Sequence, residues 1–220
     1  KYLGSVSEGS RKRLGRLGTS LDAALQAAEL HWSASNSDTF LNTEDAAVVA
    51  YVIEHSRALR KLYLDHNSIG DAGVVAIGRA LKLSTTLTHL SLSYNLVSDA
   101  GAIALGDGLS ANRALTELHL AKNFIGDLGA IALGDGLRTN RALTKLHVWR
   151  NTINDEGAAA LSSSLRHNTA MRLLDLRWNK ISAGGVDELI ATCWVSTPLF
   201  RHLLERDPSN CALIGTEAHA

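Results

Sequence analysis

Three polar side chains recur at intervals of 28 residues in a combination that can bind zinc: His119, His147 and Asp175. Two imidazoles and a carboxylate ligate zinc at about 2.0–2.2 Å. If these residues lie on neighbouring parallel strands, however, their side chains run side by side and converge on one ion only with distortion. We therefore predict an exposed polar surface at this position, with no metal ion and no cofactor.

Other residues with reactive or ligand-binding chemistry do not form a catalytic arrangement. Cys193 falls on the buried face of a predicted helix, which favours a core residue over a nucleophile. The glycines of the LGDGL segments, such as Gly106 and Gly108, lie within predicted helices and do not follow a strand into a phosphate-binding loop. No nucleophile is paired with a base at a recognisable spacing. We predict that the protein is not an enzyme.

The composition excludes several classes of partner. Lys+Arg and Asp+Glu both number 22, so the net charge is zero, which disfavours a protein that coats nucleic acid. A basic run at residues 11–16 is more consistent with a solvated loop than with a nuclear-import or phosphate-binding patch. The longest apolar run, residues 46–53, is shorter than the roughly 20 residues that span a bilayer.

The two cysteines form no CxxC motif, which disfavours a disulfide framework or a structural zinc site. We therefore expect a reducing compartment, the cytoplasm, with the nucleus as the alternative. We also expect a monomer rather than an obligate oligomer.

The chain is organised by a repeat of 28 residues, which reads L-x-x-L-x-L/V-x-x-N and continues into a helical pattern. A period of this length is typical of a solenoid, in which each unit buries its core against its neighbours. We predict one domain over residues 1–220, with degenerate repeats in 1–58, five regular repeats in 59–198, and a cap and tail in 199–220. The asparagines that mark the repeat are Asn67, Asn95, Asn123, Asn151 and Asn179.

Within each unit the pattern predicts a short strand followed by a helix. Leu118 and Leu120 exemplify strand residues whose side chains enter the core. Asp127 and its equivalents should cap their own helices, and Asn140 and its equivalents should adopt the left-handed conformation where those helices end. Glycines inside the helices, such as Gly136, cost about 1 kcal/mol each, so we expect neighbouring helices to approach closely there. The alternative is that the helix breaks at these glycines.

The first part of the chain departs from this pattern. Ser20 is a suitable N-cap for a helix over residues 21–30. The next unit, residues 31–58, should contain a helix from about residue 43 to residue 55. Its strand half, HWSASNSDTF, has lost the leucines.

Geometry predicts that the stacked units bend. Parallel strands lie about 4.8 Å apart, whereas packed helices need about 8–10 Å. The strands should therefore line the inner face, with the helices outside. The asparagine of each unit follows the strand, where the turning backbone leaves buried amide and carbonyl groups that its side chain can satisfy. We interpret these asparagines as structural.

The repeat resembles the leucine-rich repeats of the ribonuclease-inhibitor-like class, strongly over residues 59–196 and weakly over 31–58. The resemblance implies an α/β right-handed solenoid, a horseshoe arc with parallel strands on the concave face and helices on the convex face. Families of this kind include ribonuclease inhibitors, sensing regions of innate-immune receptors, a GTPase-activating protein, tropomodulins and bacterial effectors. Most bind proteins through the concave face or its rim.

The resemblance therefore implies a protein-interaction scaffold or ligand-sensing module. The alternatives are a regulator of a small GTPase and the sensing region of a larger receptor or effector. Trp and Arg are enriched at interface hot spots, and Trp149, Arg150, Arg177 and Trp178 come from adjacent repeats, so they should cluster. The alternative is that both tryptophans only cover the sheet.

Basic residues dominate the half of the predicted binding surface that carries the two tryptophans, which suggests an acidic protein partner. The predicted partner-binding residues are Tyr63, Tyr94, His119, Lys122, Lys145, His147, Trp149, Arg150, Asp175, Arg177 and Trp178.

Overall fold

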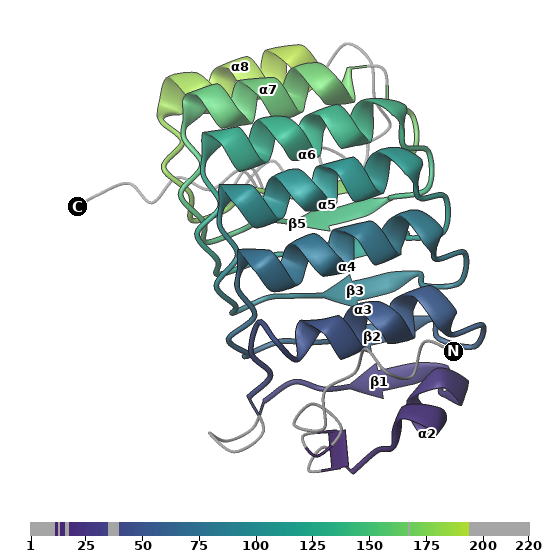
Figure 1. The fold of residues 1–220 in the computed structure, drawn as a ribbon. Helices are drawn as coiled ribbons and strands as arrows, with labels where there is room; N and C mark the ends of the chain where they lie inside the picture. The colour runs from purple at the N-terminus through teal and green to yellow at the C-terminus, as the bar shows by residue number, and fades with distance from the viewer. Residues whose placement is uncertain (1–11, 13, 16–17, 35–39, 167, 194–220) are drawn as a thin grey trace.

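The computed structural model describes residues 12, 14–15, 18–34, 40–166 and 168–193, with side chains up to Leu189. Helices and strands alternate along these residues (Figure 1). The elements are α2 (Leu21–Gln26), β1 (Glu29–His31), α3 (Ala46–His55), β2 (Lys61–Tyr63), α4 (Asp71–Leu83), β3 (His89–Ser91), α5 (Asp99–Ala111), β4 (Glu117–His119), α6 (Asp127–Thr139), β5 (Lys145–His147), α7 (Asp155–Leu165), β6 (Leu173–Asp175) and α8 (Ala183–Cys193).

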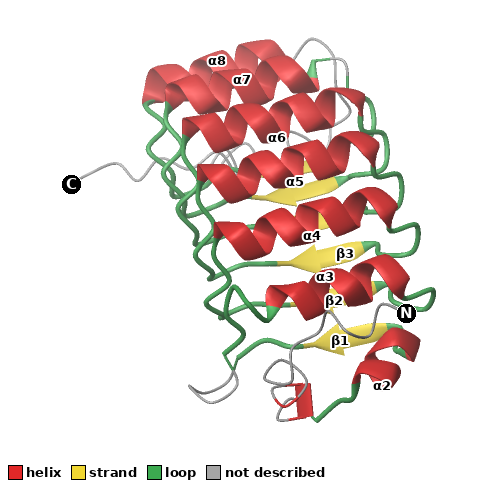
Figure 2. Cartoon of the chain, viewed as in Figure 1, coloured by secondary structure: helices red, strands yellow, loops and turns green. Residues whose placement is uncertain are grey.

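The strands form one open parallel sheet in sequence order, from β1 to β6. From β2 onward the register follows the repeat, as in the pairing of Leu118 with Leu146. Figure 2 shows the helices stacked in one layer and the strands in a second layer behind them. This arrangement confirms the predicted α/β solenoid.

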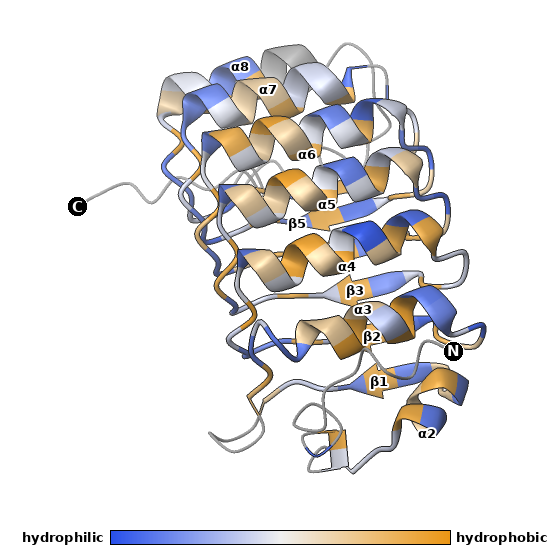
Figure 3. Ribbon diagram, viewed as in Figure 1, coloured by the Kyte–Doolittle hydropathy of each residue, from blue (hydrophilic) through white to orange (hydrophobic). Residues whose placement is uncertain are grey.

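The core lies between the two layers. The strand leucines Leu118 and Leu120 have no exposed surface, and the same holds for Leu105 and Leu109 of α5. One hydrophobic cluster extends from Leu14 to Leu189. Apolar and polar residues alternate along the helices (Figure 3), as expected where only one face of each helix is buried.

The first asparagine ladder is present as predicted. Oδ1 of Asn123 accepts a hydrogen bond from the backbone of Val97, at 3.0 Å. Its Nδ2 donates to the carbonyls of Leu92 and Leu120, at 2.9 and 3.1 Å. The side chain therefore satisfies backbone groups of two repeats at once, and this bonding recurs at Asn67, Asn95, Asn151 and Asn179.

A second ladder contradicts the prediction for the asparagines at the helix ends. Asn140 has φ −72° and ψ 137°, an extended rather than left-handed conformation. Its fully buried Nδ2 donates to the carbonyls of Leu109 and Asn112, and its Oδ1 accepts from the backbone of Leu143. The residue is asparagine because a buried turn needs both donors and acceptors there; Asn112 and Asn168 bond in the same way.

The prediction for the aspartates was also wrong in one respect. The N-cap of α6 is Gly126, and Asp127 is the first helical residue. Oδ1 of Asp127 instead accepts hydrogen bonds from the backbone of Asn154 and Gly157, at the start of α7. Each aspartate thus caps the helix of the next repeat. Helix α8 begins at Ala183, and Asp155 of the preceding repeat accepts a hydrogen bond from the backbone of Ser182 just before it.

The glycines inside the helices lie where neighbouring helices touch, as predicted. Helices α5 and α6 run through them without a break. A Cβ atom added to Gly108 would lie 2.6 Å from the carbonyl oxygen of Gly78, and one on Gly136 would meet the backbone of Gly106. Any larger residue would push the helices apart.

The first repeat differs from its predicted form. The helix expected over 21–30 ends at Gln26, and Leu30 lies in β1, paired with Leu62. These two leucines are 32 rather than 28 residues apart, so extra residues displaced the pattern. Trp32, which is 1% exposed, fills the core position that Leu64 occupies in the next repeat.

Several predictions fall on residues outside the described structure. They concern the cap and tail at 199–220, residues 11, 13 and 16 of the basic run, and the side chain of Cys193, which ends α8. In the part that is described, no helix has the length and apolar character needed to cross a membrane.

Candidate functional site

One residue in each regular repeat has a left-handed backbone, and these residues form a column along the rim of the sheet. Their φ values lie between 52° and 59°, which is uncommon outside glycine. Each directly precedes an asparagine of the first ladder, whose hydrogen bonds hold the turn. The conformation is therefore imposed by the core, and the column consists of His66, Tyr94, Lys122, Arg150 and Trp178.

The side chains of this column contact one another and Trp149, which follows β5. The rings of His66 and Tyr94 are stacked with centroids 4.0 Å apart. Nζ of Lys122 lies 4.2 Å from the centroid of the Tyr94 ring and 5.8 Å from that of Trp149. Trp149 meets Tyr94 edge-on at 6.5 Å. Cation–π contacts at exposed sites contribute about 0.5–1 kcal/mol each, so these side chains are held in place.

The guanidinium of Arg150 continues the series, 5.6 Å from the ring of Trp178. Trp178 is 48% exposed and Trp149 is half-buried, so neither belongs to the core, as predicted. Of the four residues predicted to cluster, Arg177 does not join the series, because it forms an ion pair with Asp175. We call the following six side chains the rim ridge: His66, Tyr94, Lys122, Trp149, Arg150 and Trp178.

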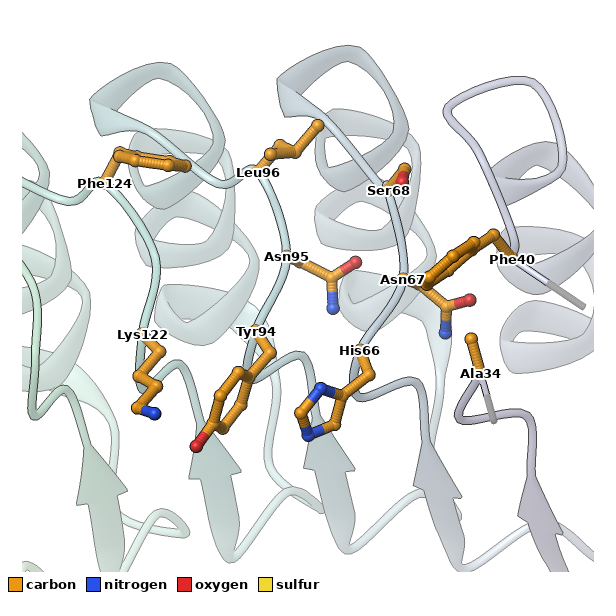
Figure 4. A pocket seen from close by; sticks show the side chains of 10 residues that line it. All are labelled: Ala34, Phe40, His66, Asn67, Ser68, Tyr94, Asn95, Leu96, Lys122 and Phe124. Carbon is orange, nitrogen blue, oxygen red and sulfur yellow. The ribbon is translucent and has the colours of Figure 1, made fainter. Parts of the chain in front are cut away.

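An open groove of about 440 Å³ runs beside one end of the rim ridge (Figure 4). Leu96 and Phe124 line the side nearer the helices, and Phe40 lies beside Asn67 (Figure 4). Phe40, Leu96 and Phe124 are 39%, 50% and 59% exposed. Figure 4 shows His66, Tyr94 and Lys122 on the side nearer the strands, with ladder asparagines between. The full lining comprises Ala34, Phe40, His66, Asn67, Ser68, Tyr94, Asn95, Leu96, Lys122 and Phe124.

The apolar side of this groove was missed in the sequence. Leu96 and Phe124 directly follow ladder asparagines, at a position that is polar in other repeats, such as Ser68 and Thr152. Reading that single column would have shown two large apolar residues in adjacent turns, where the chain is exposed.

The concave face carries a network of charged residues centred on Glu117. Its Oε1 lies 2.7 Å from Nε2 of His119, and its Oε2 lies 3.0 Å from both Nζ of Lys145 and Nε2 of His89. Burial acts to raise the pKa of Glu117, but the hydrogen bonds from His119 and Lys145 outweigh it and lower the pKa to about 2. Glu117 is therefore ionised at neutral pH.

A second cluster surrounds Asp175, which is 2% exposed. The expectation that it forms part of an exposed surface was wrong, because Arg177 folds back over it with Nη2 and Nε at 2.6 and 2.8 Å. Nδ1 of His147 lies 3.7 Å from its Oδ2. Burial acts to raise the pKa of Asp175, but His147 and Arg177 lower it to about 2.

Other predicted residues lie apart from these clusters. Tyr63 is half-buried on β2 and stacks on His31, with ring centroids 4.5 Å apart. Ser91 at the end of β3 is buried, as are Ser93 and Ala121, which follow β3 and β4, so these three positions add no accessible side chain to the concave face.

The residues that could bind a metal ion in the structure differ at one position from those considered in the sequence analysis. Among the residues that the structure describes, Glu117, His119 and His147 present ligand atoms that all lie within 4.8 Å of one another. Asp175 is replaced by Glu117 because its oxygens are bonded to Arg177.

The fold and its asparagine ladders define a leucine-rich-repeat solenoid, and comparison with known families agrees. The model of the family described as Leucine Rich repeat matches residues 55–78, 83–106, 111–134, 139–162 and 167–189, just over half of the chain. The protein belongs to this family.

Two solved structures illustrate the likeness of fold. One is described as leiomodin-1 actin-binding site 2, with a TM-score of 0.51, 17% identity, and coverage of 83% of this chain and 86% of that one. The other is the C-terminal domain of tropomodulin from Caenorhabditis elegans, with a TM-score of 0.57, 12% identity, and coverage of 74% and 97%. No curated protein matches the chain by sequence.

Proposed function

We propose that this protein binds a protein partner through the rim ridge and the adjoining groove, and that it acts as a binding scaffold rather than an enzyme. The observation that carries the proposal is the column of left-handed residues, which presents aromatic and cationic side chains from a rigid core. Aromatic residues and arginine are the types enriched in interfaces and their hot spots. Their mutual stacking reduces the entropy lost on binding.

The lining of the groove indicates the chemistry of the partner. Phe40, Leu96 and Phe124 offer an apolar surface for a large apolar side chain. Lys122 and Arg150 lie on the ridge, where they would attract a carboxylate. We infer a partner segment that carries a large apolar residue close to an acidic one.

Comparative affinity capture tests the proposal. The bait proteins are the wild type, the double variant Trp149→Ala/Trp178→Ala, and a control, Ile103→Ala/Leu128→Ala, which removes exposed apolar residues from α5 and α6. We expect at least one protein to be enriched by the wild type and the control and reduced at least tenfold with the rim variant. Equal enrichment by all three baits would contradict the proposal.

Actin is the first defined partner to test, because one structural neighbour is described as an actin-binding site. Cosedimentation with filamentous actin should retain the wild type and release the rim variant if actin is the partner. If the wild type does not sediment, actin is excluded and the capture experiment identifies the partner.

We also infer the ribonuclease-inhibitor-like subclass, because strand and helix share a 28-residue unit. A monomeric scaffold in the cytoplasm fits the zero net charge and the absence of a CxxC motif.

A further inference from the structure

We infer that Glu117, His119 and His147 form a binding site for a divalent transition-metal ion of the zinc type on the concave face. The site is separate from the rim ridge. It therefore stands or falls independently of the proposed protein partner.

The geometry of two adjacent strands brings the ligands together. His119 of β4 is in register with His147 of β5, and their rings are stacked at 4.3 Å with an interplanar angle of 11°. Glu117 lies two residues before His119 on the same side of β4, and the three ligand atoms lie within 4.8 Å of one another. Tetrahedral zinc needs ligand atoms about 3.3 Å apart, so small side-chain rotations complete the site.

Neighbouring residues orient two of the ligands. Lys145 and His89 hold Oε2 of Glu117, which directs Oε1 toward His119. Nδ1 of His147 faces the buried carboxylate of Asp175, which leaves Nε2 for the ion. A carboxylate behind a metal-binding histidine is a common outer-shell arrangement.

Two features set the strength and openness of the site. The ammonium of Lys145, bonded to Glu117, repels a cation, so we expect micromolar rather than nanomolar affinity. All three ligands are half-buried rather than enclosed, so the ion reaches the site from solvent and keeps a position for water or a partner's side chain.

The first repeat supplies a matched control. Glu29, His31, Lys61 and Tyr63 occupy the register positions of Glu117, His119, Lys145 and His147. His31 Nε2 lies 2.9 Å from Glu29 Oε1, and the ring of His31 stacks on Tyr63 as His119 stacks on His147. The two clusters differ in the last residue, a tyrosine in place of the second histidine.

Calorimetric titration of the untagged chain with zinc chloride tests the inference. We expect one site in the wild type, at least tenfold weaker binding in Glu117→Gln, His119→Gln and His147→Gln, and no change in His31→Gln. The variant Tyr63→His should raise the stoichiometry from one to two. When cobalt(II) is bound in place of zinc, its absorption should be weaker in His147→Gln than in the wild type.

The inference is overturned if the wild type takes up no zinc, or if Glu117→Gln and His147→Gln bind as the wild type does. Thermal unfolding identifies any site variant that fails to fold. In that event the test is Tyr63→His, which leaves Glu117, His119 and His147 unchanged. Binding of two zinc ions per chain supports the inference, and an unchanged stoichiometry contradicts it.

Discussion

Oδ1 of Asp127 accepts a hydrogen bond of 3.0 Å from the backbone N–H of Gly157, thirty residues later in the chain. The first turn of a helix leaves four N–H groups without intrahelical partners, and here the preceding repeat satisfies two of them, those of Asn154 and Gly157. The contact therefore couples adjacent repeats as well as capping a helix. It recurs between Asp71 and Gly101 and between Asp99 and Gly129.

Replacing Asp127 by alanine should lower the free energy of unfolding by about 1–2 kcal/mol, because the start of α7 loses its cap. Urea denaturation measures the effect. The control is Asp135→Ala, which removes the same charge from an exposed position of the same helix and should cost less than about 0.5 kcal/mol. Equal losses in the two variants would show that the cap contributes nothing.

Replacing Asn123 by alanine should lower the free energy of unfolding by about 1–3 kcal/mol, since it leaves buried backbone groups of two repeats unpaired. Asn140→Ala, in the second ladder, should cost a similar amount. Asn179 is only partly buried, so its replacement should cost less. The same unfolding measurement on the three variants checks this order, and a reversed order would refute it.

Replacing Gly136 by leucine should destabilise the protein by about 3 kcal/mol or more, because the new side chain meets the backbone of Gly106. Asp135→Leu is the matched control, since it adds a leucine at the neighbouring exposed position. Thermal unfolding should show a clear loss for the first variant and little change for the second. An unchanged midpoint in Gly136→Leu would mean that the helices do not touch there.

Asp175 should contribute to acid unfolding. Its pKa in the folded protein is about 2, below its ordinary value of 3.8, so the folded state favours the ionised form. The resulting stability is present above about pH 4 and is lost as the pH falls toward about 2, by about 2 kcal/mol.

The variant Asp175→Asn should therefore be less stable at neutral pH but lose less stability between about pH 4 and pH 2. Urea denaturation across this range measures both effects. Asp135→Asn, at an exposed position, should show the same slope of stability against pH as the wild type. If Asp175→Asn also kept that slope, the ion pair with Arg177 would not stabilise the folded state.

Much of the fold follows from the sequence, because the relevant interactions repeat at one spacing. Leu118 and Leu146 pair because equivalent positions of identical units must align in a parallel stack. Asn123 is buried because any turn after such a strand needs the same donors and acceptor. Local periodicity is sufficient for these features.

The features that were missed depend on the distance between repeats or on an interrupted pattern. The role of Asp127 depends on where the next helix begins in space, which spacing alone does not give. Extra residues hid β1 and the core role of Trp32. Asp175 is buried because Arg177 folds over it, a rotamer choice without a sequence signal.

Photo-cross-linking from the groove tests the proposed binding surface most directly. The photoreactive amino acid p-benzoylphenylalanine replaces Phe124 in one protein and Ile103, on the outer helix α5, in the other. After irradiation with the captured partner, we predict a cross-linked product from position 124 and none from position 103. A product from position 103 alone, or equal yields from both, would contradict binding at the rim ridge and groove.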